Sequence, residues 1–330
     1  MSRPPRHPPA LPELMDEPFG EILLRIPLDE PADLARATLV SKSWLRVLSD
    51  PTFRRGYRKR HCRPPLPGFI HNIYNKGPIP RFIFTTASPC SQPALSCSYW
   101  WAAGRSTLAT AGCSSTGSDH LDCAGGPFRV VFVGTDDSGC VTWASVYSSE
   151  TRDWSTMATA DSDSSTAVNL RSYIEMKPGI LIDDTLYFTL EAGLGVLKYD
   201  LVRHGLSVID APEPCDHMGT VMVAEDGGLG YAAVEHRKLN LWSWLTGEGS
   251  SARWMLRRVI QLQSLLPIHN PSISHEVIGF AEGTDTIFLL TDDAVFTLEI
   301  KLGKTKKVGR RGAYYVVLPF MSFCAPGAKP

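Results

Sequence analysis

Paired carboxylates are the feature of this chain that comes closest to catalytic chemistry. Asp136-Asp137, Asp183-Asp184 and Asp292-Asp293 each stand at the end of a predicted strand. Two neighbouring acids could hold a cation or divide the work of general acid and general base. Because the pairs recur at similar places in different parts of the chain, they favour tight turns instead, where an Asp side chain bonds its own backbone.

Histidines could act as general bases or zinc ligands. They are scattered, mostly beside Gly, Pro or charged turn residues, which predicts surface loops for His120, His204, His217, His236, His269 and His275. The eight cysteines are irregularly spaced, without a Cys-x-x-Cys pair, which indicates free thiols in a reducing compartment. Only His120 and Cys123, with Cys113 upstream, are spaced somewhat like metal ligands. A closed zinc site needs four ligands, usually as two close pairs.

The chain also lacks a phosphate-cradling glycine motif and a nucleophile elbow. We therefore expect a protein without enzyme activity of its own, without a cofactor and without a metal. A propeller enzyme fused to a helical module is the competing interpretation.

Composition limits the remaining classes. The 330 residues are 43% hydrophobic and 20% charged, as in ordinary globular proteins. A formal net charge of -1 argues against nucleic acid binding. No apolar stretch approaches the ~20 residues that span a membrane. Residues 1–10 have no hydrophobic core and so cannot be a secretory signal; we expect a disordered Pro-rich lead and an intracellular protein of cytoplasm, nucleus or both.

The elements that could position a binding surface begin with helices in residues 11–54. Asp16-Glu17-Pro18 and Asp29-Glu30-Pro31 are helix starts, since acidic residues cap free N–H groups and Pro suits the first helical position. Pro27 ends the first helix, Ser41 caps a third, and Asp50-Pro51 ends that one. A unit of this size can hardly bury a core alone, so its apolar faces predict docking onto a partner or a neighbouring domain.

Residue identities in this segment favour the partner. Leu11-Pro12, Glu21-Ile22-Leu23 and Val40-Ser41-Lys42-Ser43-Trp44 together resemble the F-box, although Ser41 replaces its common Cys. The resemblance implies binding to a Skp-type adaptor and, through it, to a cullin-based ubiquitin ligase. It also implies an adaptor surface formed or supported by Leu11, Pro12, Leu14, Ile22, Leu23, Ile26, Leu34, Val40, Lys42 and Trp44. Which of these face the adaptor and which face the internal core stays open.

A basic stretch follows the F-box segment. We interpret residues 55–67 as the basic end of a helix and a linker, which Pro64-Pro65-Leu66-Pro67-Gly68 closes. Nuclear targeting or nucleic acid contact is the less favoured interpretation.

Residues 68–330 change to a strand-like period. Four related units, spanning 128–154, 179–209, 229–260 and 277–308, contain short β-branched and aromatic runs separated by turn residues. Units of this kind recur in propellers, where blades stack to bury a shared core. A non-repeating β-sandwich is the alternative.

Particular motifs support the propeller. Tyr147-Ser148-Ser149-Glu150-Thr151, Leu197-Lys198-Tyr199-Asp200-Leu201, the run from Val277 to Thr284 and Tyr314-Tyr315-Val316-Val317 resemble the kelch-like, F-box-associated region of plant F-box proteins. Residues 88–126, rich in Ser, Ala, Gly and Cys, depart from that pattern, so an early blade could be incomplete. If the ring closes, the strand from Tyr314 could pair with an early strand at Phe69 or Phe82.

These features predict an α+β multidomain protein with a three-helix F-box and an all-β propeller-like domain. Its expected function is substrate recognition in a Skp–cullin–F-box ubiquitin ligase, in which the propeller binds a protein target that the sequence does not identify. The alternatives are a non-degradative interaction module and a partly degenerate member that binds the adaptor alone.

Overall fold

The structure is a computed structural model of the whole chain. It describes residues 16–27, 31–61, 66, 68–73, 79–85, 106–113, 128–135, 141–155, 158–159, 173–175, 177–213, 219–247, 250–267, 275–281, 283–292, 294–310 and 314–320. The chain divides into two compact units after Pro65, and the larger unit is Leu66–Ser322.

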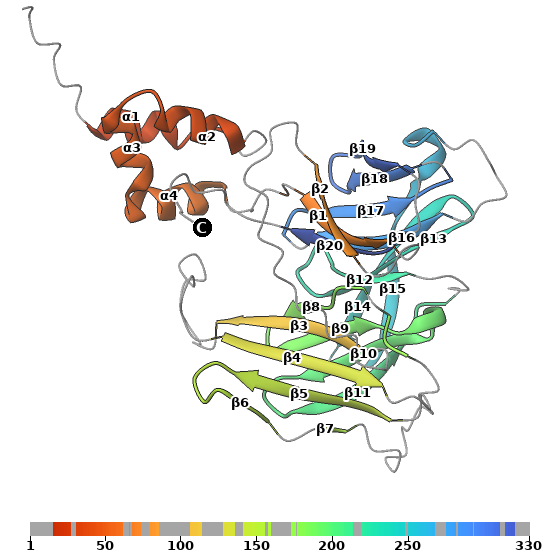
Figure 1. The fold of residues 1–330 in the computed structure, drawn as a ribbon. Coiled ribbons are helices and arrows are strands. Elements are labelled where there is room, and N and C mark those ends of the chain that lie inside the picture. Colours follow the sequence, from red (N-terminus) through yellow and green to blue (C-terminus); the bar gives the residue numbers. More distant parts are fainter. Residues whose placement is uncertain are drawn as a thin grey trace, which may run out of the picture. The chain divides into compact units, whose positions relative to one another are not determined.

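The described part of the smaller unit consists of four helices, shown in Figure 1: α1 (Asp16–Leu23), α2 (Pro31–Thr38), α3 (Lys42–Ser49) and α4 (Pro51–His61). Pro31 and Pro51 occupy first helical positions, where a missing N–H is harmless. Ser41 is the N-cap of α3, and its Oγ accepts a hydrogen bond from the Trp44 N–H at 3.2 Å. The helix starts predicted at Asp16, Pro31 and Ser41 are therefore confirmed.

A small apolar core holds these helices together. It contains Leu23, Leu34, Ala37, Leu48 and Tyr57, one or more from each helix. The Tyr57 hydroxyl donates to the Ile26 carbonyl at 2.9 Å, and burial raises the pKa of Tyr57 to about 12. The helical unit thus buries a core of its own, though a small one.

Helix α4 belongs to this core, in contrast to the solvated helix end that we expected after residue 54. Tyr57 is buried, and His61 Nε2 lies 2.9 Å from the Leu24 carbonyl oxygen. Asp50 does more than end α3, because its carboxylate accepts from the Thr52 N–H at 2.6 Å and so caps α4. The predicted boundary at residue 54 falls inside α4.

In its described residues, the larger unit contains five antiparallel sheets (Figure 1). One has the order β2-β1-β20, with β1 (Gly68–Ile73), β2 (Ile79–Phe84) and β20 (Tyr314–Phe320). The next runs β3 (Ser106–Cys113), β4 (Phe128–Thr135), β5 (Thr142–Ser148) and β6 (Asp153–Trp154), and β7 (Ala158–Thr159) also pairs with β5.

The other three sheets are four-stranded meanders. The first comprises β8 (Ile180–Ile182), β9 (Thr185–Thr189), β10 (Gly195–Asp200) and β11 (Gly205–Asp210). The second comprises β12 (Thr220–Val223), β13 (Leu229–Glu235), β14 (Lys238–Gly247) and β15 (Ser250–Gln261). The third comprises β16 (Glu276–Ala281), β17 (Thr286–Leu290), β18 (Ala294–Glu299) and β19 (Lys304–Arg310). Short 3-10 helices, η2 (Glu191–Gly193) and η3 (Leu262–Ser264), complete the described elements.

The hydrophobic cores of the larger unit lie between neighbouring sheets. One joins β4 and β5 to β9 and β10, a second joins β12–β14 to β16–β18, and a third joins β1 and β20 to β16–β18. First strands such as β12 are almost fully buried, whereas fourth strands such as β11 and β19 contain a mixture of exposed and partly buried residues. Stacked meanders that bury their first strands are the arrangement of a propeller.

The first and last strands of this unit pair with each other. Strand β20 runs antiparallel to β1, with Phe69 opposite Pro319 and Ile70 opposite Leu318. In Figure 1, blue β20 lies beside orange β1. The predicted pairing of the Tyr314 strand with the Phe69 strand is confirmed, and it ties the two ends of the unit into one sheet.

The predicted repeats match the sheets with two omissions. The units at 179–209 and 277–308 coincide with β8–β11 and β16–β19. The units at 128–154 and 229–260 each lack their first strand, because β3 and β12 were not predicted. Strand β3 lies within residues 88–126, so this departing stretch contributes a strand that pairs with β4 from Ser106 to Cys113.

Candidate functional site

The helical unit exposes an unusual number of large apolar side chains for its size. Ile22 is 57% exposed, Leu39 85%, Val40 64% and Leu45 44%. We refer to these four residues as the exposed apolar set. Exposed apolar side chains that occur singly need no explanation, but their concentration in so short a segment is typical of a docking surface.

The backbone that carries part of this set is held in place by local hydrogen bonds. The Leu39 N–H donates to the Arg36 carbonyl at 2.9 Å, and the Val40 N–H donates to the Ala37 carbonyl at 3.2 Å. Ser41 then caps α3 directly afterwards. Leu39 and Val40 therefore reach solvent from an ordered turn between two helices, which lowers the entropy lost when a partner covers them.

The structure separates the predicted adaptor-binding residues into three groups. Some are in or against the internal core: Leu23 and Leu34 are buried, and Ile26 and Trp44 pack on the buried residues. Others reach solvent: Ile22, Val40 and Lys42. Leu11, Pro12 and Leu14 lie outside the described residues.

Leu39 and Leu45 are exposed apolar residues that the sequence analysis did not assign to the adaptor surface. Helix α2 ends at Thr38, so Leu39 lies in the turn beyond it. Leu45 lies three residues before the buried Leu48 on α3, a spacing typical of one helix face, and yet it is exposed. For Leu39 the available signal was the helix end, since an apolar residue beyond a helix end cannot follow that helix's buried face. Nothing in the spacing of α3 sets Leu45 apart from Leu48.

Trp44 links α1 to α3. Its ring centroid lies 5.9 Å from that of Phe19, at an interplanar angle of 54°. Such tilted aromatic pairs contribute roughly 0.5–1.5 kcal/mol beyond simple burial. We infer that Trp44 positions α1 against α3 as well as bordering the exposed residues of α3.

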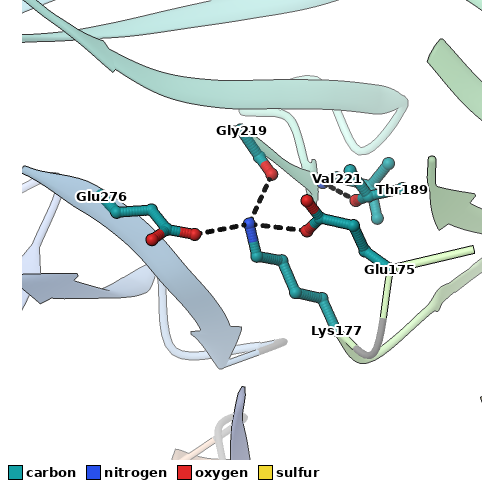
Figure 2. Close-up of polar contacts among 6 residues, drawn as sticks. All are labelled: Glu175, Lys177, Thr189, Gly219, Val221 and Glu276. Atoms are coloured by element: carbon teal, nitrogen blue, oxygen red, sulfur yellow. Dashed lines mark hydrogen bonds and ion pairs between the residues drawn. The ribbon is translucent and has the colours of Figure 1, made fainter. Parts of the chain in front are cut away.

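The larger unit contains a buried polar site at a junction between sheets (Figure 2). The Lys177 ammonium lies 2.8 Å from Glu175 Oε2 and 3.3 Å from Glu276 Oε1, and it donates to the Gly219 carbonyl at 3.0 Å. The side chains of Lys177 and Glu175 are only 3% and 7% exposed. The Val221 N–H also donates to Thr189 Oγ1 at 3.1 Å, which joins β12 to β9.

These contacts connect three sheets. Glu276 is the first residue of β16, and Gly219 immediately precedes β12. The Glu175 N–H donates to the carbonyl of Thr189 in β9 at 2.8 Å. Burial raises the pKa of Glu175, and the neighbouring Lys177 opposes that shift. A buried cation that contacts two carboxylates suits a structural clamp: the Lys177 ammonium compensates the buried Glu175, and Glu276 remains partly exposed to solvent.

His275 lies next to this junction in the chain and is also buried. The expectation of a surface-loop position for this residue was wrong, whereas His204 and His236 lie exposed in turns as expected. Burial lowers the pKa of His275, Arg237 lowers it further, and Asp292 opposes them. His120, His217 and His269 lie outside the described residues.

The carboxylate pairs lie where turns were expected, as far as the structure describes them. Asp183 and Asp184 form the turn between β8 and β9, and Asp183 has a left-handed φ of 50°. Asp292 lies between β17 and β18, where the Thr291 hydroxyl accepts from the Ala294 N–H at 3.2 Å. Asp136, Asp137 and Asp293 are outside the described residues, as are His120 and Cys123, the two residues spaced somewhat like metal ligands.

Comparison with protein families identifies the larger unit. The family model of the F-box protein AT5G49610-like beta-propeller matches residues 122–327, which is more than half of the chain. The chain belongs to this family. The predicted resemblance to F-box proteins with a C-terminal propeller is confirmed, and the sandwich alternative is excluded for this region.

Other comparisons add little to this F-box protein family assignment. No curated protein matches the chain. Among solved structures, the extracellular domain of the putative one component system BT4673 from B. thetaiotaomicron is 15% identical, with a TM-score of 0.32 over 55% of this chain. The match spans 21% of that structure, so this chain corresponds to about a fifth of its length.

The F-box protein propeller family indicates a role in protein interaction. Within the described residues, no helix is both long and apolar enough to cross a membrane. The site that best suits a protein partner is the exposed apolar set on the helical unit, while the Lys177 junction has the burial and pairing of a structural element.

Proposed function

We propose that this protein is the substrate-recognition subunit of a Skp–cullin–F-box ubiquitin ligase. Its helical unit would be the F-box that binds a Skp-type adaptor, and its propeller would bind the target protein. The observation that carries the proposal is the exposed apolar set, Ile22, Leu39, Val40 and Leu45, in a chain whose propeller belongs to an F-box protein family.

The adaptor-binding half rests on how the helical unit distributes its apolar residues. Leu23, Leu34 and Leu48 fill the core, whereas Ile22 and Leu45, their neighbours on α1 and α3, remain in solvent. Covering a fully exposed Ile, Leu or Val side chain contributes roughly 1.5–3 kcal/mol. A partner that covers several of them gains enough free energy for stable docking, and Lys42 adds an exposed charge beside them.

The target-binding half rests on the propeller. Its stacked sheets form a rigid scaffold, and the loops at the sheet ends are free to vary without disturbing the core. In this proposal the protein performs no chemistry. It accelerates ubiquitin transfer by proximity, since tethering raises the effective concentration of target lysines near the transfer centre. We place it inside the cell, where that machinery operates.

The test is co-purification of the full chain with a Skp-type adaptor. An Ile22→Glu, Val40→Glu double variant should lose adaptor binding, because it places charges on exposed apolar positions without entering the core. Leu23 is unsuitable for this purpose, since it is completely buried and a Glu there would disrupt the fold. Val202→Glu, at an exposed apolar position of the propeller, is the matched control and should bind normally.

Two results would count against the proposal. The first is a folded wild-type chain that does not bind the adaptor. The second is equal binding by the wild type and the double variant. Adaptor binding with no effect of the chain on turnover of any propeller-bound protein would favour the non-degradative interaction module.

A further inference from the structure

A cavity of about 330 Å³ lies between two neighbouring sheets of the propeller, β12–β15 and β16–β19. Its buried surface includes Met222, Leu241, Trp242 and Ile300. The lining also includes six charged residues: Glu225, Asp226, Arg257, Arg258, Asp285 and Lys301. Binding cavities for small groups begin at roughly this size, so this one suits a few side chains rather than a folded domain.

A β-bulge brings two of the charges together. In the β14–β15 ladder, Leu241 pairs with Arg258 and Trp242 pairs with Leu256, so Arg257 is an extra residue in its strand. Consecutive side chains of a regular strand point to opposite faces of the sheet, and a bulge re-aims one of them. Arg257 and Arg258 both line the cavity as a result.

One pair of opposite charges in the cavity compensates itself, because Asp285 Oδ2 lies 2.8 Å from Lys301 Nζ. Asp226 Oδ1 accepts a hydrogen bond from the Gly228 N–H at 3.0 Å and keeps its negative charge. Arg257 and Arg258 are exposed and, within the described part of the chain, make no ion pair. Glu225 and Asp226 are the exposed carboxylates of the cavity. Two adjacent guanidinium groups above an apolar floor therefore define the binding character of this cavity.

We propose that this cavity binds an acidic segment of a target protein. A Glu or Asp carboxylate of the segment would contact Arg257 and Arg258, and an apolar side chain would pack on the buried residues Met222, Leu241, Trp242 and Ile300. Guanidinium groups match carboxylate geometry and form charge-assisted hydrogen bonds with it. The inference rests on the proposed function, in which the propeller captures the target. It names the chemical class of target, which the family assignment does not.

A competing role for the bulge is protection of an edge. Strand β15 is the last strand of its sheet, and bulges and basic residues on edge strands prevent pairing with other chains. If this is their role, replacing Arg257 or Arg258 should change the aggregation of the protein, and peptide binding should not depend on peptide charge.

The experiment measures fluorescence anisotropy of short fluorescein-labelled peptides, each with two Glu residues and one Leu at varied spacing, against the full chain. We expect at least one spacing to bind, with affinity falling as salt rises. Arg257→Gln and Arg258→Gln should each weaken that binding about tenfold. Glu225→Gln should strengthen it, because it removes one of the repelling carboxylates. Arg253→Gln should not change it, because Arg253 is an exposed arginine of β15 outside the cavity.

Several outcomes would overturn the assignment: no peptide binds, peptides with Gln in place of Glu bind equally well, or Arg253→Gln weakens binding as much as Arg257→Gln. Binding by phosphoserine peptides alone would also overturn it in favour of a phosphorylated partner. Adaptor co-purification is measured on the same samples. Loss of adaptor binding with intact peptide binding would count against the proposed function and leave the cavity assignment standing.

Discussion

The helical unit and the propeller treat their apolar residues in opposite ways. The propeller places them between sheets, and exposed ones such as Val202, Leu256 and Leu302 are spread along the chain from one sheet to another. The helical unit buries a small core and leaves four large apolar side chains in solvent between Ile22 and Leu45.

The two units also differ in their buried charges. The propeller contains a cation, Lys177, held by Glu175 and Glu276, whereas the ion pairs described in the helical unit, such as Arg25 with Glu21, lie on its exposed surface. The difference teaches where stability and binding reside. A large stack of sheets can bury polar clamps, while a short helical unit has too small a core to cover all of its apolar side chains.

The largest expected effect is on the propeller clamp. Lys177→Met removes the cation and leaves Glu175 and Glu276 without it, so the propeller should lose about 3–5 kcal/mol in its free energy of unfolding. Urea unfolding followed by tryptophan fluorescence measures this, because every tryptophan except Trp44 belongs to the larger unit. Lys238→Met, at an exposed lysine of β14, is the control and should be nearly neutral. Equal losses of stability in the two variants would show that the contacts of Lys177 do not stabilise the propeller more than an exposed lysine does.

The next effect separates core from surface within the helical unit. Leu23→Ala should destabilise the helices by about 2–5 kcal/mol, because it opens a cavity in a small core. Ile22→Ala, one residue earlier and exposed, should stay within about 0.5 kcal/mol. Hydrogen exchange of the α1–α4 amides, detected by mass spectrometry, compares the two. A similar loss of protection in both variants would mean that Ile22 is part of the core after all.

A smaller effect on stability is expected at Trp254, which connects the β14–β15 hairpin to β11 of the neighbouring sheet. Trp254 packs against Trp244 with ring centroids 5.1 Å apart, and its Nε1–H donates to the Asp210 carbonyl at 2.7 Å. Trp254→Phe should cost about 1 kcal/mol of propeller stability for the lost hydrogen bond. Trp154→Phe, at a half-exposed tryptophan, should cost less in the same urea titration, and the reverse order would refute the bracing role.

The smallest effect concerns pH. Burial lowers the pKa of His275, so the folded protein keeps the imidazole neutral while the unfolded chain takes up a proton near pH 6.5. The unfolded state then binds more protons, and stability should fall as pH drops through 6.5 toward the lowered pKa. Glu175, whose pKa is raised, acts in the opposite direction at lower pH. Urea midpoints of wild type and His275→Gln isolate the histidine, and an equally steep pH dependence in both would contradict its role.

Much of the fold could be predicted because it depends on local chemistry. Proline at first helical positions, Ser41 as an N-cap and Asp183 in a left-handed turn are each determined by neighbouring backbone, so the sequence pattern was sufficient. The strands from Ile180 to Asp210 were equally accessible, because β-branched and aromatic residues alternate with clear turn residues. Strand β3 escaped prediction because pairing with β4, rather than its Ser-, Ala- and Gly-containing composition, makes it a strand. Strand β12 reads Thr-Val-Met-Val, so its composition offered a signal that the prediction missed.

The sequence by itself determined the helix starts, the turns, most strands and the family resemblance, since these follow from short-range periodicity and residue type. Only the tertiary structure decided that Leu23 lies in the core while Ile22 stays in solvent, and that Tyr57 of α4 completes the helical core. It also decided that Lys177 meets Glu276, and that a bulge directs Arg257 and Arg258 into one cavity. These facts depend on how distant segments pack, because partners many residues apart leave no periodic mark on the chain.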